Sequence, residues 1–118
     1  MTAPEPCTIL LVEDHVQLRA ILVRALEALG YRVVAAESGD AAVRLLEQGA
    51  RPQLVLTDVR MPGSVDGLHL ARWLGERQPD CKVLLQTGYT DADTGGYPVL
   101  RKPYSDVELR RAIEGALR

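Results

Sequence analysis

Polar side chains able to bind a metal ion and a phosphoryl group stand at the ends of four apolar runs of the chain. Glu13 and Asp14 come after the run 8–12, Asp58 after 54–57, Thr87 after 83–85 and Lys102 after 99–100. If these runs are neighbouring parallel strands, their polar residues converge on one crevice, the usual ligand site of an open α/β sheet. Three carboxylates, a hydroxyl and an ammonium in such a crevice favour a divalent cation together with a phosphoryl group.

Asp58 is the candidate nucleophile of an aspartyl-phosphate mechanism. At a strand end its carboxylate can face solvent while the strand holds its backbone fixed. The barrier to phosphoryl transfer is lowered mainly by positioning and by neutralising charge on the phosphoryl oxygens. Magnesium takes octahedral oxygen ligands and keeps several waters, so we expect Asp14 and Asp58 to bind Mg²⁺ directly and Glu13 to act through water.

The same crevice must hold the transferred group. Lys102 is expected to pair with the phosphoryl oxygens as a compact charge, while Thr87 and the Gly88 amide donate hydrogen bonds to them. The chain has two lysines against twelve arginines, so a lysine at this position is informative. Without the cation, two carboxylates about 4 Å apart repel by roughly 4 kcal/mol at an effective dielectric of about 20. This repulsion predicts at least one raised carboxylate pKa.

Taken alone, each of these residues also has a structural interpretation. Asp14 precedes a predicted helix and can be its N-cap. Asp58 can be a turn aspartate, Thr87 an ordinary strand residue and Lys102 a solvated strand end. His15, beside the acidic pair, is interpreted as a solvated residue at a helix start and not as a metal or phosphorelay histidine.

The apolar runs alternate with stretches of helical period, which predicts βα units feeding a parallel sheet. A further strand is expected at 32–36, and helices are expected to start after Asp14, at Ser38, after Asp66 and at Ser105, where Glu108 gives a capping-box spacing. The first two helices should end at Gly30 and near Gly49. The first should pack on the sheet through Leu18, Ile21, Leu22, Ala25, Leu26 and Leu29.

Composition sets limits on function. A chain of 118 residues is one domain with room for a sizeable core, and a formal net charge of -2 gives no basic field to gather nucleic acid. Cys7 and Cys81 lie in no metal or redox motif, which predicts free thiols in a reducing cytoplasm. Residues 1–6 are read as a flexible lead-in without signal-peptide character, and no run approaches the roughly 20 apolar residues that span a bilayer. We expect a cytoplasmic protein that binds neither nucleic acid nor membrane.

In their order and placement, these motifs resemble the receiver domain of two-component response regulators. The resemblance covers residues 7–118 and rests on Glu13-Asp14, the stretch 58–63, Asp66-Gly67, Thr87-Gly88 and Lys102-Pro103. It implies an α/β, flavodoxin-like (βα)5 three-layer sandwich with a parallel five-stranded sheet in the order 2-1-3-4-5. It also implies that the main-chain carbonyl of Arg60 binds Mg²⁺ and that a cis peptide bond before Pro103 aims Lys102 inward.

Two departures from the common receiver pattern bear on the switch. Many receivers carry, where this chain has Leu100, an aromatic residue that turns inward when the threonine moves to meet the phosphoryl group. The run 87–89, Thr-Gly-Tyr, resembles a subgroup of hybrid kinases and single-domain regulators that lacks this aromatic rotamer switch. Only fourteen residues separate Thr87 from Lys102, so we expect a shortened or vestigial fourth helix. We hypothesise that phosphorylation orders the loop 88–97 and that Tyr89 hinders water from reaching the acyl phosphate.

The expected function is a Mg²⁺-dependent phosphoacceptor switch without a DNA-binding output domain. It would take a phosphoryl group from a sensor histidine kinase or a histidine phosphotransfer protein and control an unknown downstream protein; dimerisation is left open. One alternative is a receiver fold that docks constitutively and never accepts phosphate. Another is a hydrolase resembling haloacid-dehalogenase-like phosphatases, but those usually place a general-acid aspartate where this chain has Arg60. We therefore expect no enzyme activity on outside substrates.

Overall fold

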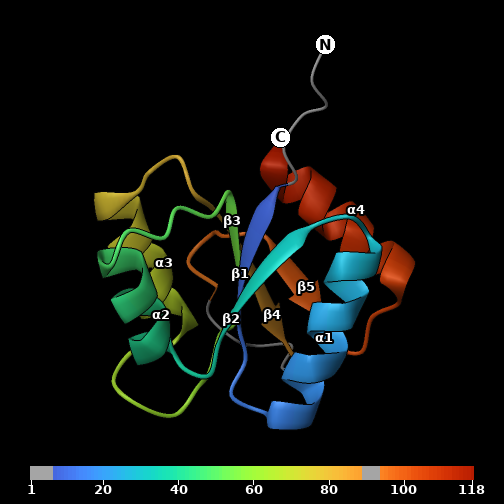
Figure 1. Ribbon diagram of the computed structural model, residues 1–118, viewed down its shortest axis with the longest axis horizontal. Helices are drawn as coiled ribbons and strands as arrows, with labels where there is room; N and C mark the ends of the chain where they lie inside the picture. The colour runs from blue at the N-terminus through green and yellow to red at the C-terminus, as the bar shows by residue number, and fades with distance from the viewer. Residues whose placement is uncertain (1–6, 89–93) are drawn as a thin grey trace.

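The computed structural model describes residues 7–88 and 94–118, which form a three-layer α/β sandwich (Figure 1). The middle layer is a parallel five-stranded sheet in the order β2-β1-β3-β4-β5, as the resemblance to receiver domains implied. Its strands are β1 (Thr8–Val12), β2 (Arg32–Ala36), β3 (Leu54–Asp58), β4 (Lys82–Thr87) and β5 (Val99–Arg101). The central strands are rich in aliphatic residues because helices cover both faces of the sheet.

Four helices form the outer layers of the described structure. They are α1 (Val16–Ala28), α2 (Gly39–Glu47), α3 (Gly67–Arg77) and α4 (Asp106–Leu117). Helices α1 and α4 cover one face of the sheet, and α2 and α3 cover the other (Figure 1). None of these helices is long and apolar enough to cross a membrane.

Local side-chain chemistry fixes the helix ends where the sequence predicted them. The side chains of three N-cap residues accept backbone N–H groups of the first turn, and one of the three forms a full capping box; these residues are Ser38, Asp66 and Ser105. Gly30 and Gly49 follow α1 and α2 with φ of 99° and 110°, a backbone region that favours glycine. The loops that leave these helices therefore turn back toward the sheet.

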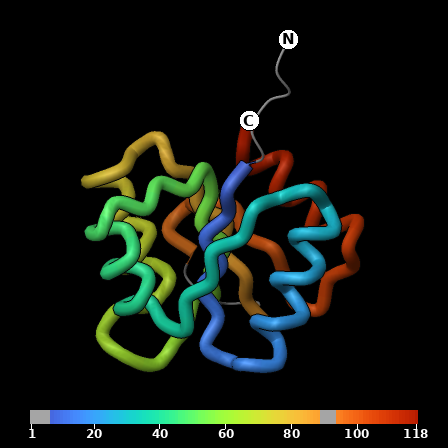
Figure 2. Tube along the Cα trace, in the orientation of Figure 1, coloured from blue at the N-terminus to red at the C-terminus, as the bar shows by residue number. Residues whose placement is uncertain are grey.

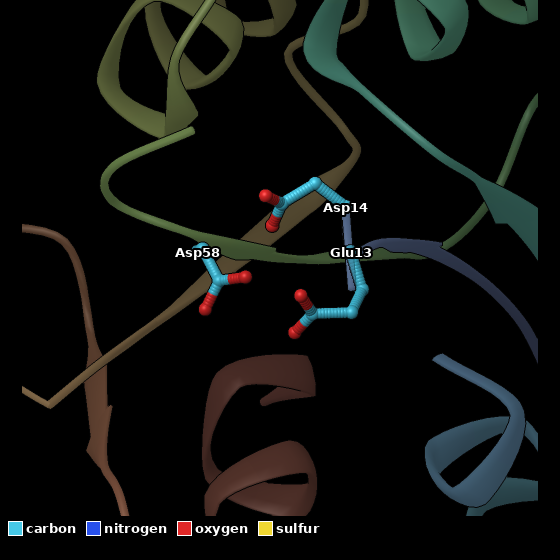
Figure 3. A group of neighbouring side chains, drawn as sticks. All are labelled: Glu13, Asp14 and Asp58. Carbon is cyan, nitrogen blue, oxygen red and sulfur yellow. The ribbon is translucent and has the colours of Figure 1, made fainter. Parts of the chain in front are cut away.

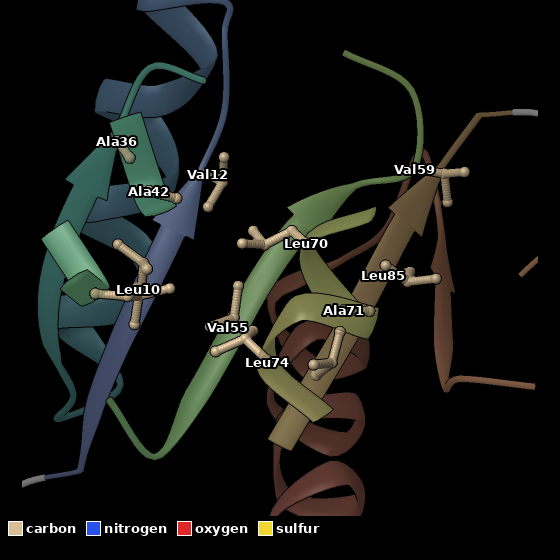
Figure 4. Packing of buried hydrophobic residues seen from close by; sticks show 12 residues of the cluster. Leu10, Val12, Ala36, Ala42, Val55, Val59, Leu70, Ala71, Leu74 and Leu85 are labelled. Atoms are coloured by element: carbon tan, nitrogen blue, oxygen red, sulfur yellow. The ribbon is translucent and has the colours of Figure 1, made fainter. Parts of the chain in front are cut away.

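Two apolar clusters hold the layers together. Figure 4 shows the cluster between the sheet and helices α2 and α3, where Leu10, Val55 and Leu85 of the strands meet Leu70 and Leu74 of α3. The second cluster joins the other face of the sheet to α1 and α4; its members include Ile9, Leu11, Leu22, Leu26, Leu56, Leu84, Leu109 and Ile113. Because both clusters include residues of β1, β3 and β4, the carboxyl ends of these strands are held rigidly.

One predicted core contact is wrong. Ile21 of α1 was expected to pack on the sheet, but it is 63% exposed. Leu22 and Leu26 are buried and carry the contact instead. At 100° per residue, the buried stripe of α1 is centred on these two leucines, and Ile21 lies at its edge, where it lines a surface groove between α1 and the start of α4.

The described part of the connection from β4 to β5 contains no helix. Residues 94–97 make a tight turn in which the Tyr97 amide donates to the Thr94 carbonyl at 3.0 Å, and Tyr97 packs against the cluster on the α3 side. A Cβ added at Gly95 would come 3.3 Å from Leu68 of α3, so the turn lies against that helix. The expectation of a shortened or vestigial helix between β4 and β5 agrees with this arrangement. The proposed ordering of the loop 88–97 involves residues 89–93, which lie outside the described residues, and stays a prediction.

The path of the chain brings the carboxyl ends of β1, β3 and β4 to one side of the molecule, the lower side in Figure 2. The loops that leave these strands for α1 and α3 lie on the same side. The polar residues at the strand ends therefore meet at this edge, as the sequence predicted.

Candidate functional site

Side chains at the ends of three adjacent strands form a row across the carboxyl edge of the sheet. Val12 pairs with Thr57 in the register of β1 and β3, so the next residues along each strand, Glu13 and Asp58, lie beside each other. Asp58 pairs in turn with Gln86 of β4. The strand register thus places the carboxylate of Asp58 between the carboxylate of Glu13 and the amide of Gln86.

The carboxylates of Glu13, Asp14 and Asp58 converge at this edge (Figure 3). Each offers an oxygen, and these oxygens lie within 4.8 Å of one another. Glu13 is 2% exposed and Asp58 is 7% exposed, whereas Asp14 stands at the exposed mouth. Hard oxygen donors at this spacing suit a cation such as Mg²⁺, which needs few protein ligands and keeps several waters. The donor set therefore fits the metal expected from the sequence.

Lys102 brings a positive charge into the same cluster. Its Nζ lies 2.7 Å from Oδ1 of Asp58 and 3.6 Å from Oε1 of Glu13. Its main-chain N–H donates to the Thr87 carbonyl at 2.9 Å, which ties the end of β5 to the end of β4. The peptide bond between Lys102 and Pro103 is cis, as the resemblance implied. Lys102 is thus an internal partner of the carboxylates and not a solvated strand end.

The electrostatics of the pocket follow from burial and from this pairing. Burial is the main reason why the pKa of Asp58 rises from 3.8 to about 7; the hydrogen bond from Lys102 opposes the rise and Glu13 adds to it. Burial lowers the pKa of Lys102, but the hydrogen bond and charge of Asp58, together with Glu13, outweigh burial and leave the pKa raised. The ammonium is therefore held in its charged form. A raised carboxylate pKa is confirmed, although its main cause is burial and not the repulsion expected from the sequence.

The predicted metal and phosphoryl residues line a single open pocket of about 370 Å³. Its lining residues are Glu13, Asp14, His15, Leu18, Asp58, Arg60, Gln86, Thr87, Gly88 and Lys102. Thr87 is 6% exposed, and Gly88 follows it at the mouth. The structure thus brings together the predicted nucleophile, the predicted ammonium and hydrogen-bond donors for the phosphoryl group, and the predicted metal ligands. Tyr89, the predicted shield of the acyl phosphate, lies outside the described residues.

Two predicted switch residues lie beside this pocket and not in it. Leu100 is 7% exposed and packs in the cluster on the α1 and α4 side. The position that is aromatic in many receivers is therefore a core position in this chain. Pro103 lines the neighbouring groove of about 330 Å³ between α1 and the start of α4.

The structure excludes one of the two interpretations of Asp14. His15 is the N-cap of α1, and its Nδ1 accepts the Leu18 amide at 3.3 Å. The interpretation of Asp14 as a helix cap is therefore wrong, and its carboxylate points toward the other two (Figure 3). His15 is exposed at the helix start, as predicted.

Two contributors to the site were not predicted. Gln86 is fully buried on β4 beside Asp58, and its only signal in the sequence was a polar residue inside the run 83–87. Gly67 donates its N–H to the Val59 carbonyl at 3.0 Å, and a Cβ at this position would collide with the main-chain oxygen of Asp58. The first turn of α3 therefore rests directly on the backbone of the candidate nucleophile.

Comparison with known proteins places this geometry in a family. Residues 9–114 match the family model of the response regulator receiver domain. The chain is 38% identical over 116 residues to the response regulator receiver protein CpdR of Brucella abortus (strain 2308), which covers 92% of this chain and 95% of that protein. It is 37% identical over 118 residues to the sensor kinase CckA of the same organism, which covers 93% of this chain but 12% of the kinase.

A solved structure agrees with these relatives. The crystal structure of a response regulator receiver protein from Sinorhizobium medicae WSM419 superposes with a TM-score of 0.86 at 29% identity, over 96% of this chain and 95% of that chain. The sheet order is the one expected of such a domain, and the acidic group lies at the edge where receiver domains generally bind Mg²⁺. This chain therefore belongs to the response regulator receiver domain family, whose members act as phosphoacceptor signalling switches in two-component systems.

Proposed function

We propose that this chain is a switch that accepts a phosphoryl group on Asp58 in a Mg²⁺-dependent reaction. The observation that carries the proposal is the surroundings of Asp58: a Lys102 ammonium at 2.7 Å and two further carboxylates whose oxygens lie within 4.8 Å. Of the three carboxylates, Asp58 is the one that is both buried and within hydrogen-bond distance of the Lys102 ammonium. These are the conditions that a phosphoacceptor carboxylate needs.

The proposed ligands of Mg²⁺ are the carboxylates of Asp14 and Asp58 and the main-chain carbonyl of Arg60, with Glu13 acting through water. These residues line the same pocket. When bound there, Mg²⁺ supplies positive charge that offsets the repulsion between the carboxylates and the charge on the phosphoryl oxygens. The raised pKa of Asp58 supports this proposal, because a buried carboxylate that is costly to ionise gains most from a cation.

In the proposed reaction, an oxygen of the Asp58 carboxylate attacks the phosphorus of a phosphohistidine. A P–O bond forms as the P–N bond breaks, and the electron pair of the broken bond stays on the imidazole nitrogen of the donor. The ionised carboxylate is the nucleophile, so Lys102 promotes the reaction by lowering the pKa of Asp58 against the effect of burial.

After transfer, Lys102, Thr87 and Gly88 hold the phosphoryl group in this proposal. The ammonium already lies at Asp58 and needs to move little to pair with the new oxygens. Thr87 is the last residue of β4 and Gly88 follows it, and both line the same pocket. In this proposal the Thr87 hydroxyl and the Gly88 N–H donate hydrogen bonds to the phosphoryl oxygens. Their rearrangement is the proposed origin of the change in shape that a downstream protein reads.

The proposed phosphoryl donor is a histidine of a sensor kinase or of a phosphotransfer protein. Receiver domains interact with such partners, and one relative of this chain is itself a sensor kinase. We propose that residues 7–118 form one receiver domain that acts in the cytoplasm, where its free thiols Cys7 and Cys81 remain reduced. Its role is that of a switch and not of a hydrolase, since Arg60 stands where a general-acid aspartate would be needed.

The test of this function uses acetyl phosphate as a small donor and intact-mass spectrometry as the readout. We expect wild-type protein with Mg²⁺ to gain the mass of one phosphoryl group, and protein in excess chelator or the Asp58→Asn variant to gain none. Asp80→Asn, at an exposed turn, is the matched control and should react like wild type. An unmodified wild-type protein would reject the proposed function.

A further inference from the structure

Gln86 and Tyr104 form a buried polar connection that the proposed reaction does not use. The Tyr104 hydroxyl donates to Oε1 of Gln86 at 2.6 Å, and Nε2 of Gln86 donates to Oε1 of Glu13 at a longer 3.4 Å. Glu13 directly follows β1 and Gln86 lies on β4, and these two strands are separated by β3. The two side chains therefore meet across the strand that carries Asp58.

Gln86 is an unusual residue for its position. It is 0% exposed on β4, in line with Leu84 on the face that packs against α1 and α4, where the neighbouring buried side chains are aliphatic. Burying an amide without partners costs free energy that an apolar residue at the same place would not cost. Both ends of the Gln86 amide are satisfied here, one by a hydroxyl and the other by a carboxylate.

The backbone of Glu13 is fixed independently of its side chain. Its N–H donates to the Ala36 carbonyl at 3.0 Å, and its carbonyl accepts from Nη1 of Arg19 at 2.9 Å. The carboxylate is then oriented by two neutral donors: the His15 amide on Oε2 at 3.1 Å and the Gln86 amide on Oε1. Lys102 at 3.6 Å contributes charge but lies beyond hydrogen-bond distance.

We propose that Gln86 is a positioning residue for the Glu13 carboxylate and that the Tyr104 hydroxyl holds Gln86 in the required orientation. An amide can turn either its oxygen or its NH₂ group toward a neighbour. Because Tyr104 occupies the oxygen, the NH₂ group faces Glu13, where an amide oxygen would meet another acceptor. Packing of the Tyr104 ring against the cluster on the α1 and α4 side keeps the hydroxyl in place.

This inference rests on the proposed function and adds a part to it. After transfer Lys102 pairs with the phosphoryl oxygens, and even a small shift of its ammonium changes the 3.6 Å contact with Glu13. The Gln86 amide and the His15 amide do not depend on that movement. They keep the Glu13 carboxylate directed at the metal site in both states, as partners of metal-binding groups commonly do.

The experiment compares Gln86→Met, Tyr104→Phe and the double variant with wild type by Mg²⁺ titration calorimetry. We expect Gln86→Met to raise the Mg²⁺ dissociation constant roughly tenfold and Tyr104→Phe to raise it by a smaller factor. Because Tyr104 acts through Gln86, adding Tyr104→Phe to Gln86→Met should cause no further change. Tyr31→Phe is the matched control, since Tyr31 packs on the same cluster at the opposite end of the sheet and should bind as wild type does.

A second readout, in the metal-free protein, separates this inference from the proposed function. The His15 amide donates to the Glu13 carboxylate, so its ¹H–¹⁵N resonance reports the orientation of that carboxylate. It should shift in Gln86→Met and Tyr104→Phe and stay in place in Tyr31→Phe. Equal Mg²⁺ affinity in wild type and Gln86→Met, additive effects in the double variant, or an unmoved His15 resonance would each overturn the inference. A wild-type protein that binds no Mg²⁺ overturns the proposed function, and the His15 resonance then still decides the positioning role.

Discussion

Nζ of Lys102, the residue that follows β5, lies 2.7 Å from Oδ1 of Asp58 at the end of β3. This contact opposes the effect of burial on Asp58 and keeps a cation beside the proposed nucleophile. Burial therefore favours the protonated form of the Asp58 carboxyl group, and the ammonium favours its ionised form. The rate of phosphorylation and the stability of the protein should therefore both depend on pH.

Replacing Lys102 with methionine should slow phosphorylation in a pH-dependent way. Lys102 lowers the pKa of Asp58, so its removal raises that pKa further and leaves less ionised nucleophile at neutral pH. We expect the reaction with acetyl phosphate to slow by roughly tenfold or more at pH 7 and to recover partly as the pH rises. Lys82→Met removes the other lysine of the chain, at the start of β4, and should change nothing. An equal loss of rate at every pH would contradict the role of Lys102 in setting this pKa.

Asp58 should make the metal-free protein less stable as the pH rises. Its folded-state pKa of about 7 lies above the ordinary value of 3.8, so the folded state holds the proton more tightly than the unfolded state does. The contribution of Asp58 to stability is complete below about pH 4 and is lost as the pH rises to about 7. We expect Asp58→Asn to be more stable than wild type at pH 8 by on the order of 2 kcal/mol, since the variant has no buried carboxylate to ionise. The loss of the contact with Lys102 offsets part of the gain in stability.

Urea unfolding in chelator, at a series of pH values from 4 to 8, checks this prediction. The difference between Asp58→Asn and wild type should grow across that range. Asp80→Asn, an exposed carboxylate at the turn before β4, should run parallel to wild type. Parallel curves for Asp58→Asn and wild type would show that Asp58 keeps an ordinary pKa.

Asp14 should contribute to metal binding and little to the stability of the metal-free fold. It is exposed and does not cap α1, so Asp14→Asn should stay within about 0.5 kcal/mol of wild type in chelator. At a Mg²⁺ concentration of about 100 times its dissociation constant, wild type should gain roughly 2.7 kcal/mol. Asp14→Asn should lose most of this gain. Thermal unfolding with and without Mg²⁺ measures both quantities, and an undiminished gain in the variant would remove Asp14 from the metal site.

The close contact between α3 and the nucleophile can be tested with two glycines of that helix. A Cβ at Gly67 would collide with the main-chain oxygen of Asp58, whereas Gly75 has nothing within 4 Å of an added Cβ. We expect Gly67→Ala to destabilise the protein by roughly 2 kcal/mol and to slow phosphorylation, because the Asp58 backbone must shift. Gly75→Ala should stabilise the protein by about 0.5–1 kcal/mol, since alanine is the better helix former. If both variants behave alike, the contact with Asp58 has no influence on the site.

Much of the site could be predicted because its residues stand at the ends of apolar runs. In parallel strands the run ends share one edge, so the meeting of Glu13, Asp58 and Lys102 follows from the alternation of strands and helices. The helix starts at Ser38, Asp66 and Ser105 were equally readable, since capping chemistry is local.

The parts that could not be predicted depend on contacts between distant segments. The bond from Tyr104 to Gln86 joins two elements through a packing arrangement that no spacing rule encodes. The exposure of Ile21 depends on how α1 sits against its neighbours, because helical periodicity gives a stripe but not its edge. The sequence could not predict that His15 and not Asp14 caps α1, since either side chain can accept a backbone N–H of the first helical turn.

The proposed function requires that Asp58 itself becomes the acyl phosphate. The most direct measurement is to treat the protein with acetyl phosphate and Mg²⁺, reduce the acyl phosphate with borohydride, and sequence the peptides by mass spectrometry. Reduction converts a phosphorylated aspartate to homoserine and leaves free aspartates unchanged. We predict homoserine at residue 58 and at no other position, with none formed in chelator. Homoserine at residue 14, or unreduced aspartate at residue 58, would contradict the claim.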